Sequence, residues 1–246
     1  LRALAANIAA ASGVNLGFVG SGSNDCGAWM AGTLPHRAAG GKVLDAAGLN
    51  AREMIEQVRD LYLMVGFEPE MDVADPGQMA AALRAGQVIA LSSYLSPWLL
   101  EHADILLPVS SYAETAGTFV NIEGVAQSFK GVAAPRGEAR PGWKVLRVLG
   151  NLADIDGFDY ADANQVRDEV LAACAGLTPD NTTGGLGGDR PQAAGGAWER
   201  IGGVPMYSVD ALTRRAHALQ LTPDAWGSAL RLNASAAQSL GLDEAS

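Results

Sequence analysis

Short apolar runs alternate with helix-like segments through residues 1 to 155. The runs "LYLMVG", "QVIALS" and "ILLPV" start at residues 61, 87 and 105, and each has the length and composition of a buried strand. Between them, residues 75–86 and 96–104 each begin with Asp or Ser followed by Pro, which is a helix-start signal. This alternation predicts an α/β fold with a doubly wound, mostly parallel sheet, flanked by helices and buried on both faces.

Other segments extend this pattern. We expect helices at residues 1–13, 51–60, 141–154 and 163–177, a buried strand at 14–20, and a loop running into a short helix at 20–32. After residue 109 the period changes, and residues 118–131 predict a small β excursion that turns at Glu123 and Gly124. Residues 208–222 predict a helix capped by Ser208, and residues 229–242 predict a strand, a cap and a helix.

These elements suggest a division of the chain into three parts. Residues 1–158 form the expected doubly wound α/β domain. Residues 159–200 hold a helix and a Gly-rich linker, because residues 178–197 contain almost nothing to bury. Residues 201–246 hold a helix and the start of a further domain. The opening "LRALAANIAAASG" has no initiator Met and is typical of a helix inside a domain, so we expect a piece of a longer protein.

Composition and charge exclude several classes of function. The 246-residue chain has a formal net charge of −10 and a pI near 4.7, which argues against nucleic acid or an anionic membrane surface as a partner. No apolar run reaches the roughly 18 residues of a membrane span, so we expect no direct membrane insertion. The cysteines and histidines are scattered, and we expect neither a metal site nor a disulfide from them. They are Cys26, Cys174, His36, His102 and His217.

Ligands of open α/β sheets bind beyond the carboxyl ends of the strands, so the loops that follow the expected strands are the candidate sites. The first, "VGSGSNDCG", could cradle a phosphate with its amides or could simply turn the chain. The loop after residue 65 carries Glu68, Glu70 and Asp72, which disfavour a phosphate there. Two like charges at about 4 Å repel by about 4 kcal/mol at an effective dielectric of 20. We interpret this second loop as solvated.

The densest polar segment is "AETAGTFVNIEGVAQSFKG", residues 113–131. Its Glu-Thr-x-Gly-Thr start favours a tight turn in which side chains bind backbone donors. Asn121 and Glu123 could fasten that turn to neighbouring loops. From the residues alone, this is an ordered polar loop at a strand end, and either a structural or a functional role remains open.

The segment "HADILLPVSSYAETAGTFVNIEGVAQ" resembles the signature of the molybdopterin oxidoreductase superfamily. That signature is an Ala-Asp-(apolar)-Leu-Pro strand followed by Glu-x-x-Gly-Thr-x-x-Asn-x-Glu-Gly-Arg-x-Gln. The matching residues are Ala103, Asp104, Leu107, Pro108, Glu114, Gly117, Thr118, Asn121, Glu123, Gly124 and Gln127. "SNDCGAWMAGTLPHR" and "MYSVDALTRRAHALQLT" are similar to segments of the large iron–sulfur subunit of NADH–quinone oxidoreductase, respiratory complex I. "ALRLNASAAQSLGL" resembles the entry to the family's C-terminal β-barrel domain, truncated here.

The resemblance implies a bacterial oxidoreductase subunit of the respiratory chain, cytoplasmic and peripheral to the inner membrane, whose partners are other subunits of the complex I peripheral arm. This chain would act in electron transport as a scaffold and docking domain without catalytic residues, and the iron–sulfur clusters would be bound upstream of it. In catalytic relatives the domain holds the guanine dinucleotide arm of the molybdenum cofactor. Val125 replaces the signature Arg, Glu68 follows Gly66 and Phe67, and no Cys, selenocysteine or Ser ligand is identifiable, so we expect no cofactor in this chain.

Two alternatives remain from the sequence. The chain could belong to an active molybdopterin enzyme such as a formate dehydrogenase, and the strand-end loops would then bind molybdopterin. The cofactor-binding residues would in that case be Gly66, Glu114, Gly117, Thr118, Asn121, Glu123 and Gln127. A free-standing nucleotide-binding module is the third possibility.

Overall fold

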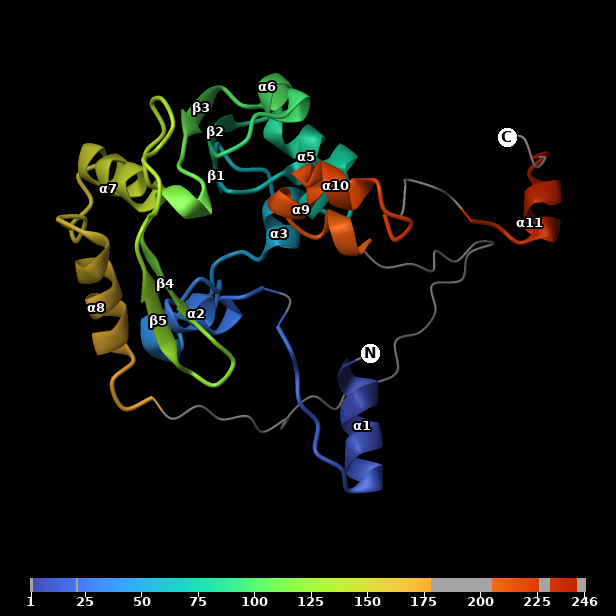
Figure 1. The fold of residues 1–246 in the computed structure, drawn as a ribbon, viewed down its shortest axis with the longest axis horizontal. Coiled ribbons are helices and arrows are strands. Elements are labelled where there is room, and N and C mark those ends of the chain that lie inside the picture. The colour runs from blue at the N-terminus through green and yellow to red at the C-terminus, as the bar shows by residue number, and fades with distance from the viewer. Residues whose placement is uncertain (1, 21, 178–204, 226–230, 243–246) are drawn as a thin grey trace. The chain divides into compact units, whose positions relative to one another are not determined.

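The computed structural model describes residues 2–20, 22–177, 205–225 and 231–242 (Figure 1). The chain divides into two compact units, Leu1–Gln192 and Ala193–Ser246. The linker predicted at residues 178–197 lies outside the described residues.

The first unit contains a parallel sheet of three strands (Figure 1). The strands are β1 (Leu61–Val65), β2 (Gln87–Ser92) and β3 (Ile105–Pro108), in the spatial order β1-β2-β3. Their connections contain helices α4 (Pro69–Asp72), α5 (Pro76–Leu83) and α6 (Pro97–His102). The predicted α/β fold with a parallel sheet flanked by helices is therefore confirmed.

The Asp-Pro and Ser-Pro signals start helices as predicted. The side chain of Asp75 accepts a hydrogen bond from the Gln78 N–H at 2.9 Å, and that of Ser96 accepts one from the Leu99 N–H at 3.2 Å. Each proline follows its cap at the first helical position, where the missing N–H has no intrahelical partner to lose. Local sequence thus fixes where α5 and α6 begin.

One face of the sheet packs on α5 and α6 and forms the core. Its cluster of buried residues includes Tyr62 and Met64 of β1, Val88 and Ala90 of β2, Met79, Ala82 and Leu83 of α5, and Leu99 of α6. The prediction of burial on both faces holds for the central strand, where Leu91, on the opposite face, is buried too. It is wrong for β1, because the outward side chains of Leu61, Leu63 and Val65 remain about half exposed.

The N-terminal region begins with helix α1 (Arg2–Ser12), as predicted. The buried strand predicted at residues 14–20 is wrong, since these residues make no ladder and Val14, Phe18 and Val19 are exposed. An apolar run becomes a strand only when a neighbouring strand supplies its hydrogen bonds. Short helices follow: α2 (Asp25–Met30), η1 (Ala39–Gly41) and α3 (Ala51–Glu56).

The predicted β excursion is an antiparallel hairpin. After the 3-10 turn η2 (Tyr112–Glu114), strand β4 (Gly117–Val120) pairs with β5 (Ala126–Phe129). Gly124 has φ +80°, which suits glycine at this turn and confirms the predicted turning point. Helices α7 (Gly142–Leu152) and α8 (Ala163–Ala173) come next, and both α2 and α8 contact β4.

The second unit contains η3 (Met206–Ser208), α9 (Ala211–Arg215), α10 (His217–Gln220) and α11 (Ala234–Ser239). The prediction of one helix capped by Ser208 is wrong, because Asp210 is the cap and the helix breaks at Ala216. Hydrogen bonds from the Thr213 and Leu212 N–H groups lower the pKa of Asp210, the first being the larger cause. The helix predicted near the end is confirmed as α11, with Asn233 as its cap.

The strand predicted ahead of α11 falls partly on residues 226–230, outside the described residues, and residues 231–233 are not a strand. Within the described ranges no helix is both long enough and apolar enough to cross a membrane.

Candidate functional site

The carboxyl ends of β1, β2 and β3 meet at one edge of the sheet, because the three strands are parallel. Gly66 lies at this edge, just past β1, with φ +60°, and its N–H donates to the Leu91 carbonyl at 2.9 Å. A positive φ of this size favours glycine over residues with a Cβ. Gly66 therefore has a turn-forming role here, whatever else the edge does.

The acidic loop after Gly66 is only partly the solvated loop that the sequence suggested, because Asp72 is exposed but Glu68 is not. Glu68 is only 4% exposed, and its N–H donates to Asp72 Oδ2 at 2.8 Å. Glu70 Oε2 is buried and accepts no hydrogen bond within the described part of the chain. The loop folds into α4, and the Asp72 carboxylate binds the N–H of Glu68, the residue that caps this helix.

The loop after β3 is also closed by its own side chains. Glu114 Oε2 accepts the Ser111 N–H at 3.0 Å, and the Ser111 side chain accepts the Glu114 N–H, a reciprocal capping box. Ser93 Oγ donates to the Ser110 carbonyl at 3.1 Å, which ties the ends of β2 and β3 together. The Ser110 hydroxyl is buried and has no hydrogen-bond partner among the described residues.

Asp104, the second residue of the signature strand, has a structural position. Its Oδ2 accepts the Val88 N–H at 2.7 Å, and its own N–H donates to the Val88 carbonyl at 3.0 Å. These two bonds join the starts of β2 and β3, at the edge opposite to the candidate site. The signature's Asp thus sets strand register rather than contacting a ligand.

The hairpin contains five of the seven residues named as cofactor-binding candidates: Gly117, Thr118, Asn121, Glu123 and Gln127. Asn121 Oδ1 accepts the N–H groups of Glu123 and Val125, both at 3.0 Å. The expectation that Asn121 fastens the turn to neighbouring loops is wrong, because these bonds close its own turn. Glu114 immediately precedes the hairpin, whereas Gly66 belongs to the sheet edge.

The remaining hairpin candidates lie on the strands. Thr118 Oγ1 and Ser128 Oγ are 2.9 Å apart across the ladder, and Gln127 is paired with Phe119. A Cβ added at Gly117 would lie 2.7 Å from the end of the Phe129 ring, so a larger residue at this position would force that ring to move.

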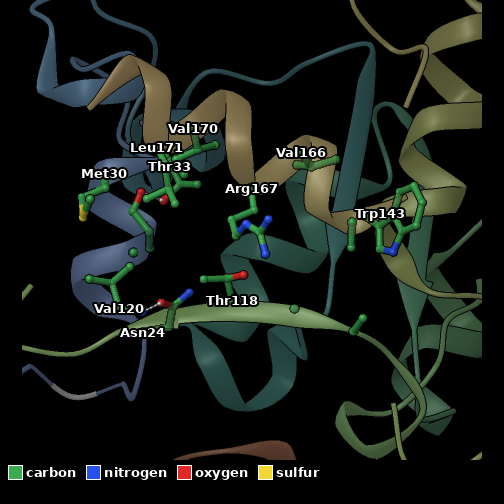
Figure 2. Close-up of a pocket in the computed structure, with 16 residues that line it drawn as sticks. Asn24, Met30, Thr33, Thr118, Val120, Trp143, Val166, Arg167, Val170 and Leu171 are labelled. Carbon is green, nitrogen blue, oxygen red and sulfur yellow. Dashed lines mark hydrogen bonds between the residues drawn. The ribbon is translucent and has the colours of Figure 1, made fainter. Parts of the chain in front are cut away.

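A pocket of about 340 Å³ lies between α2, β4 and α8, with Trp143 of α7 at one end (Figure 2). Gly117 and Thr118 line it, so the sequence located part of this site. Asn24 ties α2 to the hairpin, because its Oδ1 accepts the Val120 N–H at 2.8 Å. Cys174 Sγ donates to the Met30 carbonyl at 3.6 Å, which joins the residue after α8 to the end of α2.

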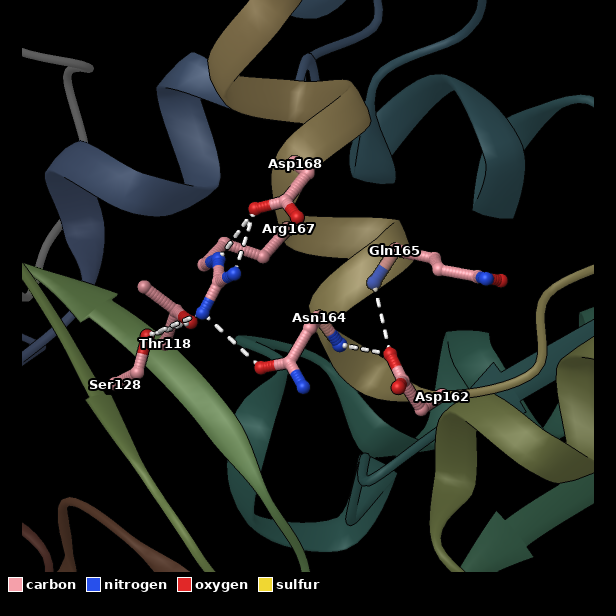
Figure 3. A network of polar contacts seen from close by, with 7 residues as sticks. All are labelled: Thr118, Ser128, Asp162, Asn164, Gln165, Arg167 and Asp168. Carbon is pink, nitrogen blue, oxygen red and sulfur yellow. Dashed lines mark hydrogen bonds and ion pairs between the residues drawn. The ribbon is translucent and has the colours of Figure 1, made fainter.

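Arg167 of α8 is the centre of a polar network beside this pocket (Figure 3). Its Nη1 donates to Asn164 Oδ1 at 3.0 Å and to Ser128 Oγ at 3.3 Å, and its Nε donates to Asp168 Oδ1 at 2.7 Å. The network links α8 to β5. Arg167 was not identified from the sequence, because no motif distinguishes it from the other polar residues of its helix. Asn24, in contrast, belongs to the segment "SNDCGAWMAGTLPHR", which was singled out from the sequence.

The same helix holds a second polar contact. The Tyr160 hydroxyl donates to Glu169 Oε2 at 2.8 Å, and this bond, helped by desolvation and by the Glu169 charge, raises the pKa of Tyr160. Among the described residues, no three His, Cys, Asp or Glu side chains are placed to hold a metal ion.

Comparison with known proteins places this geometry in context. The sequence model of the family described as Molybdopterin oxidoreductase matches residues 3–152. The "NADPH-Fe(3+) oxidoreductase subunit alpha" of Geobacter sulfurreducens strain PCA is 29% identical over 169 residues, which are 67% of this chain and 20% of that protein. The "Putative formate dehydrogenase SAR2393" of Staphylococcus aureus strain MRSA252 is 28% identical over 145 residues, 57% of this chain and 14% of that protein. The chain thus spans a fifth or less of the length of these relatives.

Proposed function

This chain belongs to the molybdopterin oxidoreductase family, and on that premise we propose that it is a domain of the large iron–sulfur subunit of NADH–quinone oxidoreductase, respiratory complex I. Its role there is scaffolding and subunit docking in the peripheral arm, with a degenerate cofactor site. The motifs "SNDCGAWMAGTLPHR" and "MYSVDALTRRAHALQLT" support the assignment to this subunit.

The observation that carries the proposal is the chemistry of the sheet's carboxyl edge, where a guanine dinucleotide would lie. A pyrophosphate needs cationic side chains or free amides. The loops at residues 66–75, 93–96 and 109–116 contain no Lys, Arg or His. Arg140 pairs with Val109 at the end of β3, but its Nη1 donates to the carbonyls of Gly137 and Ala139. The acidic residues of these loops are Glu68, Glu70, Asp72, Asp75 and Glu114.

Two amides of these loops, and one at the start of α5, are bound by carboxylates of the chain. Asp72 accepts the Glu68 N–H, Asp75 accepts the Gln78 N–H, and Glu114 accepts the Ser111 N–H. Carboxylates of the chain therefore occupy three amides at or beside this edge that an anionic ligand could otherwise bind. The residues present do not fit a dinucleotide-linked pterin.

A docking role is supported by the outward face of the sheet. Leu61, Leu63 and Val65 of β1 and Ile105 of β3 are about half exposed on the same face. Parallel sheets are normally covered on both faces, and large exposed apolar patches mark interaction sites. We propose that a helix of a neighbouring subunit packs on this face of the sheet. That helix would place an apolar stripe against the sheet and carry few charged residues.

A cofactor assay tests the proposal directly. The native polypeptide that carries residues 1–246 is isolated without air, oxidised, and analysed for fluorescent pterin and for molybdenum, with an active formate dehydrogenase as the positive control. We expect neither pterin nor molybdenum above background. A stoichiometric yield of oxidised pterin would refute the degenerate site.

A second candidate is a domain of an active molybdopterin enzyme such as a formate dehydrogenase. The name of the Staphylococcus aureus relative supports it, and so does the Ser110 hydroxyl, which is buried without a partner just past β3. A buried polar group of this kind is stabilised when a ligand or water completes its hydrogen bonding. The pterin assay separates this candidate from the first.

A further inference from the structure

The pocket between α2, β4 and α8 differs from the rest of the molecule in its charge. The chain has a formal net charge of −10, yet no Asp or Glu lines the pocket. Arg167 is the one formally charged side chain among the lining residues. Figure 2 shows it extending from α8 toward Thr118 on β4. The local charge therefore favours a ligand with one negative group.

The guanidinium of Arg167 already binds Asn164, Ser128 and Asp168, and the contact with Asp168 is the one that such a ligand can displace. Its Nε and Nη2 both lie 2.7 Å from Asp168 Oδ1, but the Asp168 side chain is 63% exposed, and an ion pair in water is weak. Arginine presents five N–H donors in a planar fork that matches a carboxylate. A ligand carboxylate in the pocket can bind the Arg167 guanidinium in place of Asp168, or both carboxylates can bind it together.

The remaining walls are apolar. Met30 of α2, Val166, Val170 and Leu171 of α8, and Trp143 of α7 face the cavity. An apolar cavity of about 150 Å³ takes up benzene, so 340 Å³ holds a body on the order of ten non-hydrogen atoms. A nucleotide is too large and too polar for these walls, and a phosphate dianion would find only one cation.

We infer that this pocket binds a compact monocarboxylic acid with an apolar body, whose carboxylate lies on Arg167 and whose body lies against Met30, Val166 and Val170. This site adjoins the loop that follows β3, since Ala116 and Gly117 line it, but it does not depend on the proposed complex I role. Affinity comes from the apolar walls, while Arg167 selects the acid over its neutral analogues.

The test compares 4-methylbenzoate with its neutral isostere 4-methylbenzamide, titrated into the native polypeptide that carries residues 1–246 and followed by calorimetry and ligand-observed NMR. We expect the acid to bind at least ten-fold more tightly than the amide. Arg167→Gln should remove that preference, whereas Arg52→Gln, which changes an exposed arginine paired with Glu56, should leave it intact. Asp168→Asn should tighten binding of the acid a few-fold, because it removes the competing carboxylate.

Val170→Phe provides the check on the apolar walls, since it fills the pocket and leaves Arg167 in place. It should abolish binding of both compounds with little change in the melting temperature. Equal binding of acid and amide, no binding of either, or an unchanged preference in Arg167→Gln would each overturn the inference. If Arg167→Gln fails to fold, the Val170→Phe and Asp168→Asn results decide, and wild-type affinity in both would also overturn it.

Discussion

The sheet region and the hairpin region of the first unit are held together by different forces. The largest fully buried side chains in the described structure are Pro69, Leu83, Val88, Leu91 and Leu99, and all of them belong to the sheet and its connecting segments. Around the hairpin, the buried apolar side chains of the described residues are those of Val120 and Cys174. The sheet region is thus stabilised chiefly by apolar burial.

The hairpin region depends instead on polar contacts between distant residues. Asn24 binds the Val120 amide across 96 positions of sequence, Cys174 binds the Met30 carbonyl across 144, and Arg167 binds Ser128 across 39. These contacts surround a cavity rather than a packed core. The comparison teaches that one unit can combine a sheet with a packed apolar core and a hairpin region whose few long-range hydrogen bonds leave room for a ligand.

The largest effect should come from the sheet core. Leu99→Ala removes a side chain that is 0% exposed, and we expect a loss of about 2–5 kcal/mol in the free energy of unfolding. Leu100→Ala, one position along α6 and 59% exposed, should change it by less than about 0.5 kcal/mol. Denaturant titration measures both. Equal losses in the two variants would contradict the assignment of the core to this face.

A smaller effect is expected from packing within the hairpin. Gly117→Val places methyl groups against the Phe129 ring, and we expect a cost of about 1–3 kcal/mol in the free energy of unfolding. The matched control is Gly17→Val, because a Cβ at Gly17 has no atom within 4 Å. Thermal unfolding followed by circular dichroism compares them. An unchanged melting temperature in Gly117→Val would show that the hairpin accommodates the larger side chain with no loss of stability.

The smallest effect concerns the link between α2 and the hairpin. Asn24→Ala removes the acceptor of the Val120 N–H and should lower the free energy of unfolding by about 1 kcal/mol. Asn24→Asp keeps an oxygen at that place and should restore most of the loss. Hydrogen exchange of the Val120 amide gives a local readout, with faster exchange expected in Asn24→Ala alone. Equal exchange rates of the Val120 amide in the two variants would show that Asn24 does not link α2 to the hairpin.

Sequence predicted the parts of the fold that are encoded locally. The strands at β1, β2 and β3 and the starts of α5 and α6 follow from apolar runs and from Asp75 and Ser96 ahead of prolines. The turn at Gly124 follows in the same way. The strand prediction for residues 14–20 was wrong because this apolar run has no partner strand. The presence of a partner strand cannot be read from a local sequence pattern.

The candidate site was predicted only in part for the same reason. Gly117 and Thr118 lie in a recognisable motif. Asn24 and Arg167 line the same pocket, but both are far from that motif in the sequence. The burial of Glu68 was missed because charge alone suggested solvent, whereas α4 folds the loop back on itself. Tertiary contacts override residue type in such places.

The position of β1 at the edge of the sheet has a practical consequence for handling the protein. Among the described strands β1 is paired only with β2, and its sequence "LYLMV" has no charge and no proline. An uncharged apolar strand with a free edge is a template on which another molecule can add a strand. When separated from its neighbours, the protein should therefore self-associate through this edge as its concentration rises, and a lysine at Leu63 is the simplest substitution for keeping it in solution.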